Sequence, residues 1–138
     1  LLAMKVEKFE DLNIWQKARS LTGEIYRLTK NTQFRKDLVL SNHIRRTSIS
    51  LMSNIAEGFE RATNKEFIQY LFVAKGSLGE IRSQLYLALD QEYISKRDFD
   101  RICEMTKLLS GMITNLIKYL DTSEVKGKKF KSSKKAEK

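Results

Sequence analysis

Apolar residues recur at alternating spacings of four and three in four stretches of the chain, which is typical of helices that pack in a bundle. The spacing predicts helices from about residue 11 or 13 to 30, from about 36 to 61, from 64 towards 90, and from 96 towards 120. No stretch alternates with the period of two that a strand requires. Short connections place neighbouring helices antiparallel. We therefore predict an all-α fold, an antiparallel up-down-up-down four-helix bundle.

Two of the predicted helices begin at recognisable capping residues. Thr63 stands three residues before Glu66, and Ser95 stands three residues before Asp98. A hydroxyl at the cap position accepts a hydrogen bond from a free backbone N–H, and an acid three residues later suits the same turn. The third and fourth helices are therefore expected to start directly after Thr63 and Ser95.

A hairpin of the second and third helices gives a register in which facing residue numbers sum to about 125. In this register Ser48 faces Ser77, and Glu80 falls opposite Arg45 or Arg46, so we predict an ion pair between Glu80 and one of these arginines. A glycine inside a helix costs roughly 1 kcal/mol relative to alanine. Two of them, Gly76 and Gly79, therefore predict a close crossing of helices. The structural polar cluster expected in this region comprises Arg45, Arg46, Asn54, Glu57 and Glu80.

Composition and charge divide the chain into three parts. Residues 1–8 form an N-terminal extension, 9–121 the bundle, and 122–138 a basic tail that is too polar to bury and is expected to be disordered. Seven lysines and one acid stand between 126 and 138, so most of the net charge of +9 lies in the tail. With one cysteine, no secretory signal and no apolar run of about 20 residues, a cytoplasmic protein without a membrane span is expected.

The positive charge favours nucleic acid as a partner, since lysine and arginine bind phosphates without reading the base sequence. No helix-turn-helix, RNP motif or aromatic platform accompanies it, so sequence-specific recognition is not predicted. For any single basic residue, exposure to solvent alone is the better interpretation, whereas the chain as a whole favours non-specific binding. The candidate nucleic-acid-binding residues are Arg45, Arg46, Arg61, Lys65, Lys128, Lys129 and Lys131.

The sequence lacks the residue sets that enzymes on helical bundles use. A di-iron site needs Glu-x-x-His motifs on two helices, whereas this chain has one histidine, His43. No phosphate-binding glycine loop and no nucleophile elbow occur. We therefore expect no enzyme activity, no metal site and no cofactor.

Several apolar residues lie beside the rows of apolar residues that define the four helices. The bundle core cannot bury all of them, so some must be exposed. Such surface usually marks a partner, so self-association is the first interpretation and a loosely packed monomer the alternative. These residues are Met52, Phe72, Val73, Tyr86, Leu87, Leu108, Met112 and Tyr119.

Four separated motifs carry a resemblance to a known family over about residues 9–120. They are FEDLNIWQKA at 9–18, IRR at 44–46, SNIAEG at 53–58 and AKGSLGE at 74–80. In these motifs the chain resembles the intervening-sequence proteins of large-subunit ribosomal RNA, a family related to the accessory variability determinants of diversity-generating retroelements. The resemblance implies an antiparallel bundle that assembles into a homopentamer. For the retroelement relatives it also implies contact with nucleic acid and a reverse transcriptase.

Taken together, the residues and the resemblance predict a non-enzymatic, homo-oligomeric basic bundle. Its expected role is to bind RNA or DNA without strong sequence preference, as an accessory factor. The alternative is a protein-protein adaptor or scaffold that has no direct contact with nucleic acid. The two differ in their response to salt, because binding through phosphates weakens steeply as the salt concentration rises.

Overall fold

The computed structural model of the chain describes residues 6–125 and the side chains of residues 6–122. In this part of the chain all regular elements are helices. They are the 3-10 turn η1 (Phe9–Asp11) and the α-helices α1 (Asn13–Leu28), α2 (Thr32–Lys36), α3 (Leu38–Glu60), α4 (Asn64–Asp90) and α5 (Lys96–Val125). The predicted all-α bundle is confirmed, and α2 is an additional short helix between the first two long ones.

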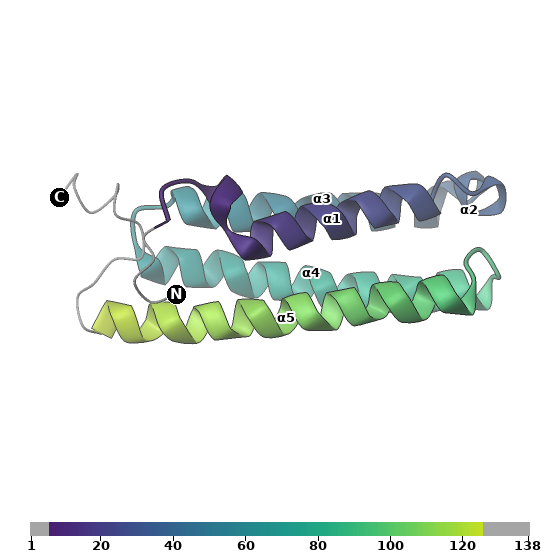
Figure 1. Cartoon of the computed structure of the whole chain (residues 1–138). Helices are drawn as coiled ribbons and strands as arrows, with labels where there is room; N and C mark the ends of the chain where they lie inside the picture. The colour runs from purple at the N-terminus through teal and green to yellow at the C-terminus, as the bar shows by residue number, and fades with distance from the viewer. Residues whose placement is uncertain (1–5, 126–138) are drawn as a thin grey trace.

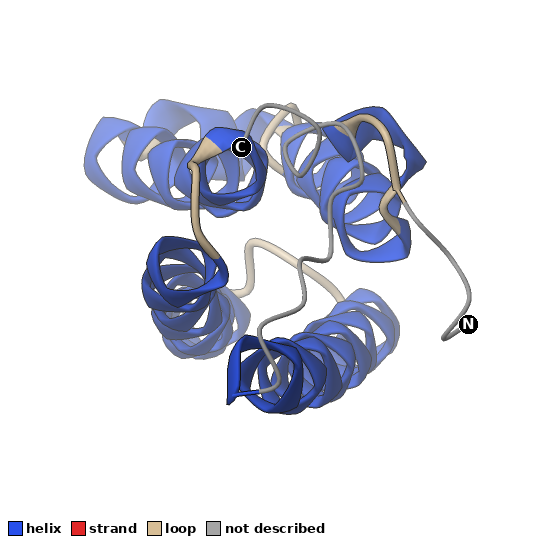
Figure 2. Cartoon of the chain, turned by 90° about the vertical axis from the view of Figure 1, so that its left-hand side faces the viewer, coloured by secondary structure: helices blue, strands red, loops and turns tan. Residues whose placement is uncertain are grey.

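The four long helices lie side by side and alternate in direction (Figure 1). Seen end-on in Figure 2, they stand at the corners of a square, so that α3 adjoins α1 and α4, while α5 adjoins α4 and α1. The short helix α2 lies at one end of the bundle, where α1 passes into α3 (Figure 1). The α3–α4 connection lies at the opposite end.

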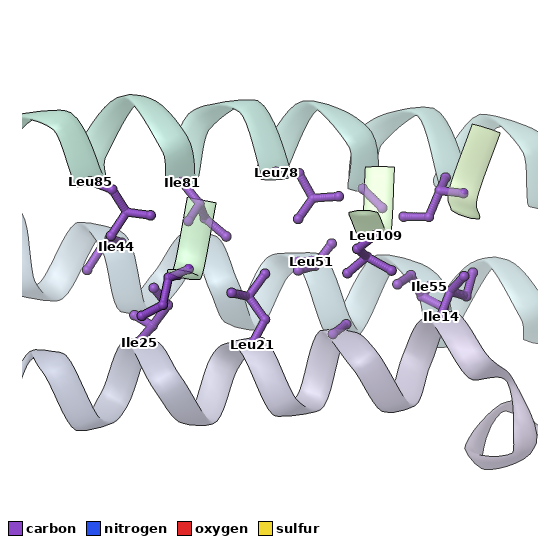
Figure 3. Close-up of a cluster of buried hydrophobic side chains, with 14 of the residues drawn as sticks. Ile14, Leu21, Ile25, Ile44, Leu51, Ile55, Leu78, Ile81, Leu85 and Leu109 are labelled. Carbon is purple, nitrogen blue, oxygen red and sulfur yellow. The ribbon is translucent and has the colours of Figure 1, made fainter. Parts of the chain in front are cut away.

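The core lies along the axis between the four helices and consists mainly of apolar residues that recur at spacings of four and three on each helix. Figure 3 shows Leu21 and Ile25 of α1 pointing towards Ile44 and Leu51 of α3, with Leu78 of α4 opposite. All five side chains are at most 1% exposed. Burying a side chain of this size stabilises the fold by about 1.5–3 kcal/mol, so the seam supplies the main stabilisation.

Capping hydrogen bonds define the helix starts. The Thr63 hydroxyl accepts from the backbone N–H of Glu66 at 3.1 Å, and the Ser95 hydroxyl accepts from Asp98 N–H at 3.0 Å. Both predicted caps are therefore confirmed. Asn31 caps α2 through bonds from the N–H groups of Gln33 and Phe34 at 3.0 and 3.3 Å.

A clamp of three side chains holds α2 against the end of the bundle. Phe34 is fully buried, and its ring stacks on that of Tyr93 in the α4–α5 connection, with centroids 5.2 Å apart. The Tyr93 hydroxyl donates to Asp37 Oδ2 at 2.9 Å, while Asp37 Oδ1 accepts the N–H of Leu40 and caps α3. These two bonds, that from Leu40 first, lower the pKa of the Asp37 carboxyl. The clamp therefore joins the connection between α1 and α3, which contains α2, to the connection between α4 and α5.

The glycine prediction is wrong in its position. A Cβ placed on Gly76 or Gly79 would meet no atom of the chain within 4 Å, so no helix of the described chain crosses closely there. The close crossing occurs at Gly58 instead, where an added Cβ would lie 2.7 Å from the Cβ of Tyr70 and 3.0 Å from Cδ1 of Phe67. The sum of 58 and 67 is 125, so the predicted register of α3 and α4 is close to the observed one.

Ion pairs connect α1 to α5 and so close the ring of helices. Arg101 donates to Glu24 at 2.8 Å, and Arg27 donates to Asp98 at 3.1 Å, while each arginine also contacts the other carboxylate. The hydrogen bond from Arg101 is the largest cause of the lowered pKa of Glu24. For Asp98 burial raises the pKa, but the hydrogen bonds from Arg27 and Arg101 together outweigh it and lower it.

The outer limits of the bundle differ from the predicted divisions at 8 and 121. Val6, in the predicted extension, is 8% exposed and joins the core, and α5 continues to Val125. Within the described residues, no helix combines the length and apolarity that a membrane crossing needs.

We predict that replacing Gly58 by alanine destabilises the protein. The added methyl group would overlap the backbone-anchored Cβ of Tyr70, and overpacking of this kind typically costs about 1–3 kcal/mol. The matched control is Gly111→Ala on α5, where the methyl group meets nothing and improved helix propensity should stabilise by roughly 1 kcal/mol. Urea denaturation measures both. Equal stability of the two variants would contradict the close crossing.

We also predict that the α1–α5 ion pairs contribute stability that is lost in acid. Because the pKa values of Glu24 and Asp98 are lowered by folding, their contribution is present above the unfolded pKa, about 4, and disappears as the pH falls through the folded values. Glu24→Gln combined with Asp98→Asn should be less stable than the wild type at pH 6 and nearly equal to it at pH 2. Urea midpoints at both pH values test this, with the exposed Glu104→Gln as control.

Candidate nucleic-acid interface

Arg45 lies between α3 and α1, where it is half-buried. Its Nε donates to the Thr29 hydroxyl at 2.7 Å, and its guanidinium carbon lies 4.4 Å from the centre of the Tyr26 ring. A cation placed over an aromatic face in this way stabilises by about 0.5–2 kcal/mol. Arg45 therefore docks α3 on α1, and its donors are in part already used.

The predicted ion pair of Glu80 with Arg45 or Arg46 is wrong. Glu80 Oε2 lies 3.6 Å from Nε2 of His43, and neither arginine forms an ion pair with it. The reason is that α3 has helices on both sides, so Arg45 turns towards α1 and its Tyr26. Arg46 is exposed, and no hydrogen bond or ion pair of its side chain occurs within the described residues.

The other members of the predicted polar cluster also lie apart. The Asn54 amide donates to the carbonyl and hydroxyl oxygens of Ser50, at 2.8 and 3.0 Å within its own helix. Glu57 instead accepts a hydrogen bond from the Tyr70 hydroxyl of α4 at 3.2 Å. The expected cluster is thus divided into separate contacts of α3 with α1, with α4 and with itself.

Arg61 and Lys65 lie at the end of the bundle that carries the α3–α4 connection. The Arg61 guanidinium donates to the Tyr70 hydroxyl at 2.7 Å, which raises the pKa of the arginine further. Lys65 is exposed. Residues 57–66 contain three acids and two bases, so this end has no excess of positive charge.

The candidate basic residues are therefore not brought together on one surface of the described chain. Arg46 and Arg61 are separated by fifteen residues along α3, which corresponds to about 22 Å. Lys128, Lys129 and Lys131 lie outside the described residues. A different set of exposed bases lies on the segment that leads from α1 through α2 into α3.

A basic corner forms where α1 passes through α2 into α3. We define it by the exposed residues Lys30, Arg35, Lys36 and Arg46. The segment from 27 to 46 holds six basic residues and one acid, Asp37, whose carboxylate is occupied by Leu40 N–H and Tyr93. Because Phe34 buries one side of α2, Arg35 and Lys36 are held towards solvent.

The sequence prediction missed three of these four residues, Lys30, Arg35 and Lys36, since it ended the first helix at 30, began the second at about 36 and placed no helix between them. Two signals were available. Asn31 is a good cap with helix formers after it, and Phe34 is an isolated large apolar residue that a short helix could bury. Arg35-Lys36 is also the one pair of adjacent bases in the sequence before the second long helix.

The side chains that could bind a metal ion form no cluster in the part of the chain that the structure describes. No three His, Cys, Asp or Glu side chains gather there as ligands. The thiol of Cys103 is buried, and this burial raises its pKa, which disfavours the nucleophilic thiolate. The chemistry available at the basic corner is the binding of anions by exposed ammonium and guanidinium groups.

Comparison with known proteins agrees with the fold. A crystal structure from Bacteroides thetaiotaomicron, described as a protein of unknown function from the S23 ribosomal protein family, superimposes with a TM-score of 0.71. It is 24% identical, and the match covers 76% of this chain and 98% of that one. None of the curated proteins compared with the chain matches it. The model of the 23S rRNA-intervening sequence protein family matches residues 10–115. Because this match spans most of the bundle, the chain belongs to the family of 23S rRNA-intervening sequence proteins.

Proposed function

We propose that this protein is a non-enzymatic, homo-oligomeric bundle that binds RNA without strong sequence preference, as an accessory factor. The basic corner is the observation that carries the proposal. It comprises the exposed residues Lys30, Arg35, Lys36 and Arg46, and the chain segment from 27 to 46 that carries them contains one acid, Asp37, whose carboxylate is already bonded. The family's description refers to ribosomal RNA, which favours RNA over DNA as the ligand.

The geometry supports contact with phosphates and not the reading of bases. Arginine and lysine side chains neutralise phosphate charges whatever the sequence, and phosphate contacts supply most of non-specific affinity. The aromatic side chains near the corner are already engaged, because Phe34 stacks on Tyr93 and Tyr26 lies under Arg45. They are therefore not free to stack on unpaired bases, as sequence-specific RNA modules require.

Assembly of several copies would strengthen this binding. One corner with four cations can contact few phosphates, whereas linked copies present several corners to the same RNA and gain in effective concentration. The number of copies, five by family resemblance, stays a prediction, as do a reverse transcriptase partner and a cytoplasmic location. A scaffold that binds proteins alone is the second candidate, and the exposed apolar residues on α4 favour it.

We predict that removing charge from the basic corner weakens RNA binding more than removing the same charge elsewhere. The variant Lys30→Gln/Arg35→Gln/Lys36→Gln should lower affinity for labelled single-stranded RNA of mixed sequence about tenfold or more at low salt. The slope of log affinity against log salt should fall by about 2, since each lost phosphate contact contributes about 0.7. Fluorescence anisotropy over a salt series measures both quantities.

Two further variants with three charges removed serve as comparisons. Lys8→Gln/Lys17→Gln/Lys118→Gln alters exposed lysines outside the corner and should leave binding within about twofold. Lys128→Gln/Lys129→Gln/Lys131→Gln tests the tail separately. If the wild type does not retain RNA at low salt, the proposal is wrong. An equal loss in all three variants would mean that only total charge matters.

A further inference from the structure

Two exposed apolar residues, which we call the apolar pair, begin α3 directly beside the bases of α2. Leu38 and Val39 are 66% and 82% exposed. The bases Arg35 and Lys36 end α2, and only Asp37 separates them from the pair. Since consecutive Cα atoms lie about 3.8 Å apart, those of Lys36 and Leu38 are at most about 7.6 Å from each other. Contact with phosphates does not account for exposed leucine and valine at this position.

The apolar pair lines an open cleft on the surface of α3, which we call the α3 cleft. Its other lining residues are Asn42, His43 and Arg46, which recur with the apolar pair at helical spacings of three and four. One face of a single helix therefore forms the whole cleft. Its volume of about 390 Å³ is at the small end of the range of about 300–1,000 Å³ that is typical of ligand sites. Arg46 belongs both to the cleft and to the basic corner.

The charges of the α3 cleft nearly cancel. Arg46 contributes one positive charge. Glu80 of α4 contributes one negative charge, because its Oε2 lies 3.6 Å from Nε2 of His43 in the cleft wall. The cleft therefore suits an uncharged group, whereas the cations of Arg35 and Lys36 beside it suit phosphates. A ligand that fits both has an anionic part and an uncharged, partly apolar part.

A nucleotide of single-stranded RNA has these two parts. Its base, when unpaired, can be splayed out and packed on side chains, including histidine rings and arginine guanidinium planes, whereas bases in a duplex are paired and stacked. The Asn42 amide and the His43 ring each offer a donor and an acceptor, which can bond to the edge of any base. No hydrogen bond occupies the Asn42 amide in the described part of the chain. Such a cleft accepts bases without strong preference.

We propose that the α3 cleft takes one unpaired base of a single-stranded RNA, with the neighbouring phosphates on Arg35 and Lys36. The face of the base packs on the apolar pair, and its edge bonds to Asn42 or His43. The inference rests on the proposed RNA binding and adds the class of RNA, single-stranded at this point. A duplex contacts the basic corner through its phosphates alone. The exposure of two apolar residues beside the bases of α2 is thereby explained.

The variant Leu38→Ser/Val39→Ser tests the cleft, because it removes the apolar pair and no charge. Affinity for a short single-stranded RNA of mixed sequence should fall about fivefold or more, as expected for the loss of one packed base. The slope of log affinity against log salt should not change, since no phosphate contact is lost. Affinity for a blunt RNA duplex should stay within about twofold. Fluorescence anisotropy measures all three quantities, and circular dichroism checks the fold.

The matched control is Phe72→Ser/Val73→Ser, which removes another adjacent pair of apolar residues, 57% and 52% exposed on α4. It should leave affinity for the single-stranded RNA within about twofold. Sedimentation velocity is measured on both variants. If Leu38→Ser/Val39→Ser dissociates an assembly that the control leaves intact, the apolar pair belongs to a contact between copies and the inference is wrong.

An abasic strand separates the base from the phosphates of the same RNA. The wild type should bind a strand with abasic sites about fivefold more weakly than the complete RNA, whereas Leu38→Ser/Val39→Ser should bind both equally. This coupling is specific to a base in the cleft, since a merely structural effect of the substitutions would weaken binding of both strands alike.

His43 provides a direct probe, because it is the one histidine of the chain and its ring protons give a distinct NMR signal. A base in the cleft changes the ring-current field at these protons. Single-stranded RNA should therefore shift them in the wild type, whereas the duplex, or inorganic phosphate at equal ionic strength, should not. Equal shifts with all three ligands would contradict a base in the cleft.

The outcomes distinguish this inference from the proposed function. Equal wild-type affinity for complete and abasic strands, or unchanged affinity in Leu38→Ser/Val39→Ser, would overturn the base site. The RNA proposal would still stand if Lys30→Gln/Arg35→Gln/Lys36→Gln lost affinity in the same assay. A wild-type chain that retains no RNA at low salt would overturn both.

Discussion

The close contact of α3 with α4 at Gly58 is the constraint on which the rest of the structure depends. Because Gly58 has no side chain, the end of α3 can lie directly against Phe67 and Tyr70, which stand in the first turns of α4. That contact fixes the register of α3 against α4, that is, which residues of the two helices lie opposite each other. Once their register is set, the seam residues of α4 meet those of α3, and the remaining residues of α4 are committed to the outside. The exposure of Phe72 and Val73 on α4 is a consequence of this register.

The same arrangement separates two kinds of surface. The end of the bundle near Gly58 carries acids and bases in near balance, and Arg61 is bonded to Tyr70 there. The other end carries α2, which Phe34 and Tyr93 clamp in place with its bases exposed. The exposed bases Lys30, Arg35 and Lys36 and the exposed apolar side chains of α4 therefore lie on different elements.

Much of the fold could be predicted from the chain because it depends on local chemistry and period. The seams, the caps at Thr63 and Ser95, and the approximate α3–α4 register all follow from residue spacing. The candidate site was less predictable. The prediction for Glu80 considered only the pair α3 and α4. In the structure Arg45 contacts Tyr26 and Thr29, which lie on the other side of α3. A pairwise register cannot decide between two neighbouring helices that both offer partners.

The sequence by itself determined the helices, their antiparallel order and which residues enter the core, because hydrophobic period and capping act within a few residues of each position. Only the tertiary structure decided which glycine lies at a close crossing, Gly58 and not Gly76 or Gly79, because that depends on atoms contributed by another helix. It also decided that the bases of α2 face the solvent, because α2 is held against the bundle by the packing of Phe34 on Tyr93, almost sixty residues away in the chain. Long-range contacts of this kind leave no periodic trace in the chain.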